Sequence, residues 1–214
     1  MPGPRIDVML VDDHAVVRMG FRLLIEAAPD MRVVAEAASG EDAVRVVEEA
    51  RPDVVVMDIS MPGIGGLEAL RRILAKAPEA RVLVLSAHED TIHPTRAIQA
   101  GALGYLTKRG APEELIGAIR RVAGGKTFIE PAIAQEMAVA RTSGGGSPID
   151  VLTTREFQVF IALAQGHSAN SIAQTMSLSP STVGTHLYNI KQKLGAANSA
   201  ELTLIAIRYG LIHA

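Results

Sequence analysis

The feature that most constrains the fold is an alternation between short apolar runs and amphipathic segments over the first 123 residues. The apolar runs are rich in Val and Leu, whereas the segments between them repeat apolar residues at helical spacing. Five such strand–helix units predict an α/β domain with a five-stranded, doubly wound parallel sheet. The strands are expected at about 6–11, 32–37, 53–57, 81–86 and 103–107. The helices are expected at about 14–27, 41–50, 66–76, 93–100 and 112–123.

The alternation stops after residue 123, which indicates a change of architecture. We expect a linker over 124–147, because its last part is rich in Gly and Ser, and the stretch 131–141 within it is compatible with a helix. Residues 148–214 predict a small all-α domain. In it, Ser179 and Pro180 suit the cap and first position of a long helix that follows a shorter helix closely. This arrangement is typical of a helix-turn-helix.

Composition narrows the classes of protein that remain. A chain of 214 residues can form two domains, each with its own core. The formal net charge of -2 excludes a chain whose overall charge attracts nucleic acid, and the lack of cysteine excludes disulfides and thiolate metal sites. No apolar run approaches the roughly 18 residues of a transmembrane helix, and the N-terminus lacks the pattern of a signal peptide. We therefore expect a cytoplasmic protein without membrane association.

Chemically useful side chains follow four of the predicted strands. The first strand ends in Asp12 and Asp13, the third in Asp58, the fourth in Ser86 and the fifth in Lys108. Because ligands of open parallel α/β sheets bind at the carboxyl ends of the strands, these groups are expected to meet at one edge. Taken singly, each has an ordinary explanation as a turn residue or a solvated side chain. Their joint occurrence favours a functional site.

Three clustered carboxylates favour a bound cation, and Mg²⁺ fits because it prefers oxygen ligands and tolerates carboxylates together with a phosphate. Once neutralised by the ion, Asp58 could act as a nucleophile toward phosphorus. Lys108 would then offer a positive charge to the phosphoryl oxygens, and the hydroxyl of Ser86 a hydrogen bond. Tyr105, an isolated aromatic residue near this edge, is either an edge-strand residue or a reporter of the site.

These segments resemble the receiver domain of bacterial response regulators over residues 5–123. The segments that carry the resemblance are Val11–His14, Met57–Gly63, Ser86–Ala87 and Gly104–Lys108. The resemblance implies a CheY/flavodoxin-like fold and phosphorylation of Asp58 by a sensor histidine kinase. It also implies that Mg²⁺ is held by Asp12, Asp13, Asp58 and the backbone carbonyl of Ser60.

The same resemblance implies a phosphorylation switch. Ser86 and Tyr105 would turn inward when Asp58 is phosphorylated, and Lys108 would sense the phosphoryl group. Ser86 stands where threonine is commoner in the family, a difference that preserves the hydroxyl group.

The predicted helix over 180–194 has two distinct faces. An apolar stripe at helical spacing faces the core and consists of Val183, Leu187, Ile190 and Leu194. The residues opposite or flanking that stripe are Ser181, Gly184, Thr185, Tyr188, Lys191, Gln192 and Lys193. A polar face between two lysines suits a helix in the major groove of DNA, with the lysines near phosphates. An ordinary amphipathic surface helix would show the same pattern.

The C-terminal part resembles the LuxR-type helix-turn-helix of NarL/FixJ response regulators. The matching segments are Leu152–Glu156, Gly166–Ala173, Leu178–Val183 and Lys193–Ala196. Within that family the chain is most similar to the GacA/UvrY group, through Ser60–Ala69 and Ala206–Leu211. Gly184 stands where the family usually has a lysine that touches DNA, so Thr185 and Tyr188 are expected to carry more of the base preference.

The resulting hypothesis is a non-enzymatic, two-domain regulator of transcription. Phosphorylation would release the output domain to form a homodimer on promoter DNA, and dimerisation is assigned to Leu202, Ile205 and Ala206 of an apolar last helix. Residues 148–214 carry four Lys/Arg against three Asp/Glu, so a monomer should bind DNA weakly. The alternatives are a receiver with a protein-interaction tail, a Mg²⁺-dependent phosphohydrolase, and regulation that does not require phosphorylation.

Overall fold

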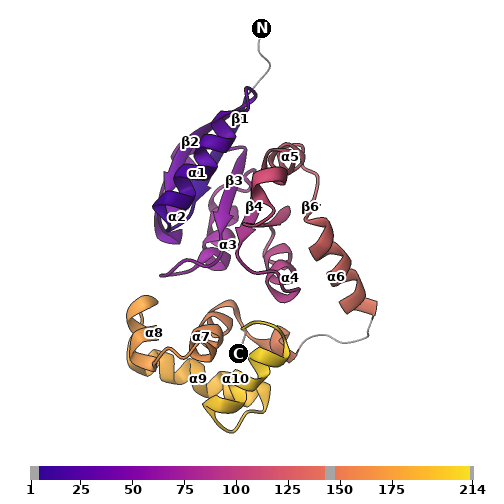
Figure 1. Ribbon diagram of the computed structural model, residues 1–214. Coiled ribbons are helices and arrows are strands. Elements are labelled where there is room, and N and C mark those ends of the chain that lie inside the picture. The colour runs from indigo at the N-terminus through magenta and orange to yellow at the C-terminus, as the bar shows by residue number, and fades with distance from the viewer. Residues whose placement is uncertain (1–4, 143–147, 213–214) are drawn as a thin grey trace. The chain divides into compact units, whose positions relative to one another are not determined.

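The protein consists of two compact units in the computed structural model, which describes residues 5–142 and 148–212. One unit extends to Ala138 and the other begins at Val139 (Figure 1). The first combines a sheet with helices, and the second is entirely helical. Within the described part of the chain, no helix is both long enough and apolar enough to span a lipid bilayer.

The first unit is built on a parallel sheet of six strands in the order β2-β1-β3-β4-β5-β6. The strands are β1 (Ile6–Val11), β2 (Met31–Ala37), β3 (Val54–Asp58), β4 (Arg81–Ser86), β5 (Gly104–Thr107) and β6 (Phe128–Ile129). The doubly wound parallel sheet expected from the sequence is confirmed, and β1 and β3 lie next to each other in its middle.

The sixth strand was not predicted, because two residues are too short to show a periodic pattern. Phe128 pairs with Gly104 and Ile129 with Tyr105, so the chain adds one more strand after the fifth strand–helix unit. The helix that follows contributes Ile133 to the core of the sheet. Part of the segment expected as a linker therefore belongs to the first compact unit.

Helices cover both faces of the sheet. They are α1 (Ala15–Glu26), α2 (Gly40–Ala50), α3 (Gly66–Lys76), α4 (Ile92–Gln99), α5 (Ala111–Ala123) and α6 (Pro131–Thr142). One apolar cluster joins α1 and α5 to the sheet, and a second joins α2, α3, α4 and α6. Val8 and Leu10 of β1 belong to the first cluster, whereas Met9 and Val11 belong to the second. This alternation explains why the central strands are apolar throughout, since both faces are buried.

The loop after β3 is held close to the strand end by Gly66. The backbone N–H of Gly66 donates to the carbonyl of Ile59 at 3.2 Å. A side chain at Gly66 would overlap the carbonyl oxygen of Asp58 and the Cα atom of Ile59. The absence of a Cβ atom thus allows α3 to begin directly against the end of the strand that carries Asp58.

The second unit contains a short 3₁₀ helix (Pro148–Val151) followed by α7 (Thr154–Ala164), α8 (Ala169–Thr175), α9 (Pro180–Leu194) and α10 (Ser199–Arg208). Helix α9 packs against α7 and α8, and α10 packs against α7. The N-termini of α7 and α9 are capped by Thr153 and Ser179, and the cap of α9 was expected from the sequence. Val183 and Ile190 of the predicted apolar stripe are fully buried.

Candidate functional site

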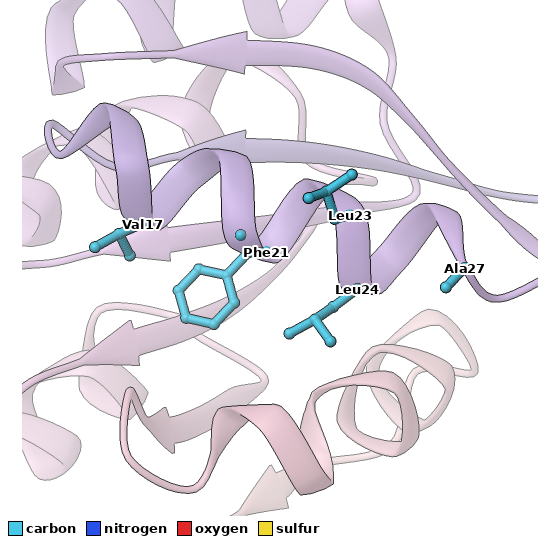
Figure 2. A pocket seen from close by; sticks show the side chains of 6 residues that line it. Val17, Phe21, Leu23, Leu24 and Ala27 are labelled. Atoms are coloured by element: carbon cyan, nitrogen blue, oxygen red, sulfur yellow. The ribbon is translucent and has the colours of Figure 1, made fainter.

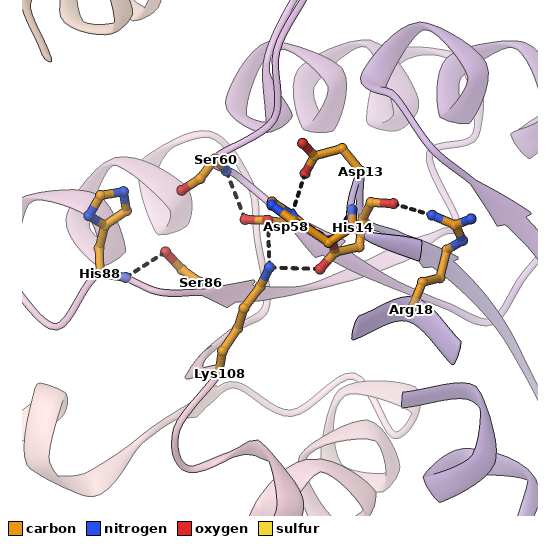
Figure 3. Close-up of polar contacts among 9 residues, drawn as sticks. Asp13, His14, Arg18, Asp58, Ser60, Ser86, His88 and Lys108 are labelled. Carbon is orange, nitrogen blue, oxygen red and sulfur yellow. Dashed lines mark hydrogen bonds and ion pairs between the residues drawn. The ribbon is translucent and has the colours of Figure 1, made fainter. Parts of the chain in front are cut away.

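Four neighbouring strands bring the predicted polar groups to one edge of the sheet. The strand order places β1, β3, β4 and β5 side by side, and their registers are matched near their carboxyl ends. Asp58 lies opposite Leu85, and Ser86 lies opposite Thr107. The residues that follow these strands therefore surround a single pocket, which Figure 3 shows with its polar contacts.

Lys108 connects two of the carboxylates at the centre of this pocket. Its Nζ atom lies 2.7 Å from Oδ2 of Asp12 and 2.6 Å from Oδ2 of Asp58. Both aspartates are buried, with exposed fractions of 4% and 2%. The three side chains come from the ends of β1, β3 and β5, so residues 50 and 96 positions apart are brought into direct contact (Figure 3).

Burial dominates the electrostatics of Asp58. It raises the pKa of this carboxyl, and the ion pair with Lys108 and the hydrogen bond from the Ser60 N–H at 2.8 Å offset the rise only in part. Burial also disfavours the charged form of Lys108, but its two carboxylate partners keep the pKa of the ammonium above its usual value. The pocket therefore holds a permanent cation and two buried acids, and further positive charge would favour the ionised form of Asp58.

The acidic groups suit a metal ion. Ligand atoms of Asp12, Asp13, His14 and Asp58 all lie within 4.8 Å of one another. Oδ1 of Asp13 is buried and accepts no hydrogen bond, although His14 Nδ1 lies 3.1 Å away. A buried carboxylate oxygen without a hydrogen bond requires another source of positive charge, and a divalent cation with oxygen ligands provides it. The residues present thus fit Mg²⁺.

Two residues beside the pocket were not predicted as part of the site. His14 directly follows Asp12 and Asp13 in the sequence, and its side chain contacts both carboxylates. The guanidinium of Arg18 donates to the carbonyl oxygen of Asp12 (Figure 3). Arg18 also pairs with Glu36 of β2 at 3.0 Å. The position of Arg18 one helical turn after His14 is a sequence signal that could have identified it.

Ser86 and Tyr105 are both tied to the backbone of His88. The Ser86 hydroxyl accepts a hydrogen bond from the His88 N–H at 3.1 Å, and the Tyr105 hydroxyl donates to the His88 carbonyl at 2.8 Å. Both side chains are fully buried, and burial raises the pKa of Tyr105. The structure thus places these two residues at the predicted edge, where each is hydrogen-bonded to the loop after β4. Figure 3 shows the bond between Ser86 and His88.

The outer face of α9 is exposed, as the sequence predicts for a helix that contacts DNA. The exposed residues among those predicted are Ser181, Gly184, Thr185, Tyr188, Gln192 and Lys193. Tyr188 is the most prominent of the apolar side chains there, with an exposed fraction of 64%, and Lys191 is partly buried. The hydroxyl of Thr185 donates to the Ser181 carbonyl at 3.1 Å, so its oxygen remains able to accept a hydrogen bond.

Lys193, predicted to contact DNA, has an acidic partner within its own domain. Its Nζ atom lies 2.6 Å from Oε2 of Glu156, whose side chain is 5% exposed. The same carboxylate accepts from the Thr153 N–H at 2.8 Å and thereby completes the cap of α7. Lys193 therefore neutralises a buried acid within its own domain. The sequence of α9 alone could not reveal this partner, because Glu156 belongs to α7.

The structure also corrects the surface expected for dimerisation. Leu202 and Ala206 are fully buried in the helical unit and cannot contact a partner as predicted, and Ile205 is partly buried. The exposed apolar residues of the same helix are Leu204 and Ile207, with exposed fractions of 63% and 37%. A helix that is apolar on all sides does not reveal from its sequence which side packs against a neighbour such as α7.

An apolar pocket lies on α1, apart from the residues predicted for the site. It has a volume of about 530 Å³ and is lined by Val17, Gly20, Phe21, Leu23, Leu24 and Ala27. Figure 2 shows Val17, Phe21 and Leu24 on the same side of α1. Val16 and Met19 of the same helix are also exposed. Contiguous exposed apolar surface of this kind commonly marks contacts with other proteins.

Comparisons with known families agree with both halves of the structure. Residues 8–120 match the model of the response regulator receiver domain, and residues 150–206 match that of the bacterial regulatory proteins of the luxR family. The chain is 42% identical to response regulator GacA of Pseudomonas aeruginosa over 211 residues, covering 98% of this chain and 99% of GacA. It is also 42% identical to response regulator UvrY of Escherichia coli, covering 98% of this chain and 97% of UvrY.

A solved structure adds to this agreement. The crystal structure of a LuxR-family two-component response regulator from Aurantimonas is 45% identical with a TM-score of 0.63, covering 64% of this chain and 99% of that one. Two family models in the expected order, together with relatives matched over nearly their whole length, establish the resemblance seen in the motifs. The chain therefore belongs to the NarL/FixJ family of two-component response regulators, in which a receiver domain precedes a LuxR-type helix-turn-helix domain.

Proposed function

We propose that this transcription regulator is switched by transfer of a phosphoryl group from a sensor histidine kinase to Asp58. The observation that carries the proposal is the bridge from Lys108 to both Asp12 and Asp58 at 2.7 and 2.6 Å within a buried pocket. Because the ammonium already contacts the carboxylate of Asp58, it would be within reach of a phosphoryl group attached there. Phosphoryl transfer depends mainly on such positioning and charge neutralisation.

Mg²⁺ would be held by Asp12, Asp13, Asp58 and the backbone carbonyl of Ser60. The buried oxygen of Asp13 that accepts no hydrogen bond supports this assignment. The ion would supply positive charge that offsets the repulsion between the carboxylates and the incoming phosphoryl group. A carboxylate oxygen of Asp58 would form the new bond to phosphorus while the phosphorus–nitrogen bond of the kinase phosphohistidine breaks, and the nitrogen keeps the electron pair.

Phosphorylation would then rearrange the residues around His88. The Ser86 hydroxyl would leave the His88 N–H to donate to a phosphoryl oxygen, and Lys108 would move its hydrogen bond from Asp58 to the same group. Tyr105 would follow because its hydroxyl is bonded to the carbonyl of His88. The two hydrogen bonds on a single residue support Ser86 and Tyr105 as a coupled switch.

The output would be specific binding of promoter DNA by a homodimer. Residues proposed to contact DNA are Ser181, Gly184, Thr185, Tyr188, Lys191 and Gln192, and the exposure of this face supports them. Lys193 would reach a phosphate only by giving up its bond to Glu156. The exposed Leu204 and Ile207, rather than the buried part of α10, are proposed to meet the second protomer.

A phosphodonor experiment tests this function. Full-length protein is treated with a small acyl phosphate and Mg²⁺, and phosphorylation, oligomeric state and DNA affinity are followed together. We expect wild-type protein to become phosphorylated, to dimerise and to bind DNA more tightly, and Asp58→Asn to do none of these. Asp53→Asn is the matched control, because Asp53 directly precedes β3 whereas Asp58 ends it. Phosphorylation of Asp58→Asn, or unchanged DNA binding by phosphorylated wild type, would overturn the proposal.

A further inference from the structure

A second group of metal-ligating side chains lies on the loop between β4 and α4. It consists of His88, Asp90 and His93, and a ligand atom of each lies within 4.8 Å of the others. The three residues fall within six positions of the chain, on the loop and in the first turn of α4. None of them belongs to the acidic pocket around Asp58, and none is required by the phosphoryl transfer proposed above.

The group is already ordered as a metal site would need. Oδ1 of Asp90 accepts from the backbone N–H groups of Ile92 and His93 at 2.8 and 2.9 Å, which fixes the carboxylate. Its Oδ2 lies 2.6 Å from Nδ1 of His93. The rings of His88 and His93 are stacked with centroids 3.8 Å apart and an angle of 1° between their planes. These contacts restrict the rotation of all three side chains before any ion binds.

We propose that His88, Asp90 and His93 form a binding site for a divalent transition-metal ion of the Zn²⁺ type. Two imidazoles and a carboxylate are ligands that Zn²⁺ accepts in a tetrahedral site with water in the fourth position. Bond lengths of about 2.0–2.1 Å place such ligand atoms about 3.3 Å apart. Oδ2 of Asp90 and Nδ1 of His93 lie 2.6 Å apart, and all three ligand atoms lie within 4.8 Å of one another, so small shifts of the side chains would reach this spacing. Mg²⁺ is excluded by its preference for oxygen ligands.

The electrostatics of the group agree with this assignment. Burial and the neighbouring His93 lower the pKa of His88 to about 4, so its imidazole is neutral near pH 7. A neutral imidazole is the form that binds metals. Burial would raise the pKa of Asp90, but hydrogen bonds from His93 and the backbone outweigh it, and the carboxyl is ionised. A neutral imidazole from His88 and an ionised carboxylate from Asp90 are thus available to a divalent cation.

An ion at this place would act on the proposed switch. His88 provides the N–H that Ser86 accepts and the carbonyl to which Tyr105 donates. Fixing the His88 side chain would hold that backbone in place and oppose the departure of Ser86 toward a phosphoryl group. This consequence depends on the function proposed above, whereas the binding of the ion does not.

Binding is tested by titrating full-length protein with Zn²⁺ by calorimetry, and with Co²⁺ by its visible absorption, in excess Mg²⁺ so that the acidic pocket is occupied. We expect one equivalent with a tetrahedral Co²⁺ spectrum, and at least a tenfold loss of affinity in both His88→Gln and His93→Gln. Circular dichroism of the metal-free variants verifies their fold. His14→Gln, in the acidic pocket, and His167→Gln, exposed in the helical unit, are the matched controls and should bind as wild type. No binding, or loss in His14→Gln alone, would overturn the site.

The consequence for the switch is tested by repeating the phosphodonor experiment with saturating Zn²⁺. We expect the phosphorylation-dependent gain in DNA affinity to fall several-fold in wild type and to stay unchanged in His93→Gln. An equal fall in both proteins would overturn the coupling and assign the effect to another site. If phosphorylation fails to raise DNA affinity without Zn²⁺, the proposed function fails, while the titration still decides the metal site.

Discussion

At the acidic pocket the charged groups are buried and paired with one another, whereas on the outer face of α9 the polar groups are exposed. Lys108, Asp12 and Asp58 form two ion pairs shorter than 2.8 Å, and their positions are set by three strands. Tyr188 and Gln192 instead extend from one helix. The comparison teaches that the pocket is pre-organised for chemistry, while the helix face depends on a partner to complete its interactions. Mutations should therefore alter stability at the first region and affinity at the second.

The largest effect is expected from removing the cation of the pocket. Lys108→Met leaves two buried carboxylates without their partner, so the free energy of unfolding should fall by about 3 kcal/mol without Mg²⁺. Excess Mg²⁺ should restore most of it, because the ion replaces the lost positive charge. Urea denaturation with and without Mg²⁺ measures both values. Lys126→Met, at an exposed lysine, is the control, and a loss independent of Mg²⁺ would show that the lysine acts by packing alone.

The next effect is expected on the exposed face of α9. Tyr188→Ala should weaken specific DNA binding by about 1–3 kcal/mol, whereas Lys191→Ala should lower the salt dependence of binding by about one phosphate contact. Neither should change the free energy of unfolding by more than about 0.5 kcal/mol. Fluorescence anisotropy over a range of salt concentrations separates the two. Equal losses on specific and unrelated DNA in Tyr188→Ala would remove its role in base preference, and the absence of salt-sensitive binding in wild type would favour a protein-interaction tail.

Lys193 tests whether a residue of α9 that is paired with a buried acid affects stability, as the paired residues of the pocket are expected to do. Burial would raise the pKa of Glu156, but Lys193 and Thr153 lower it below the usual value. Ionised Glu156 therefore stabilises the fold at pH values above the usual pKa of a glutamate. This stabilisation is lost as the pH falls through the lowered pKa of Glu156. Lys193→Ala should cost about 1 kcal/mol at neutral pH after screening and should flatten that acid dependence. Thermal unfolding from pH 7 to 3 measures it; an unchanged profile would show that the pair contributes nothing.

The smallest effect is expected at Gly184. Open space surrounds this position, and a Cβ atom there would meet no other group within 4 Å. Gly184→Ala should therefore stabilise the helical domain by about 0.5–1 kcal/mol through its helix propensity. Denaturant unfolding measures the gain, and Gly117→Ala, within α5 with equally open space, is the matched control in the receiver. A decrease in stability at Gly184 alone would indicate that α9 requires a glycine there.

The sequence predicted the regular elements well and the tertiary partners poorly. The bounds of α3 and β4 agree with the prediction because α3 has helical periodicity and β4 is a continuous apolar run that ends in a polar residue. The proximity of Asp12, Asp58 and Lys108 could be predicted, because the carboxyl ends of neighbouring parallel strands lie at the same edge of the sheet. The partner of Lys193 and the buried side of α10 could not be predicted, since both depend on which surface of a neighbouring helix α7 presents.

The residue that follows β6 has a mechanical consequence. Glu130 accepts from the Thr107 N–H at 2.8 Å through its carboxylate and donates its own N–H to the Tyr105 carbonyl at 3.0 Å. The end of β5, directly before Lys108, is therefore hydrogen-bonded to the residue that precedes α6. Any displacement of this strand end must either carry Glu130 along or break its hydrogen bonds. A movement at the acidic edge would thus reach the start of α6 through a single residue.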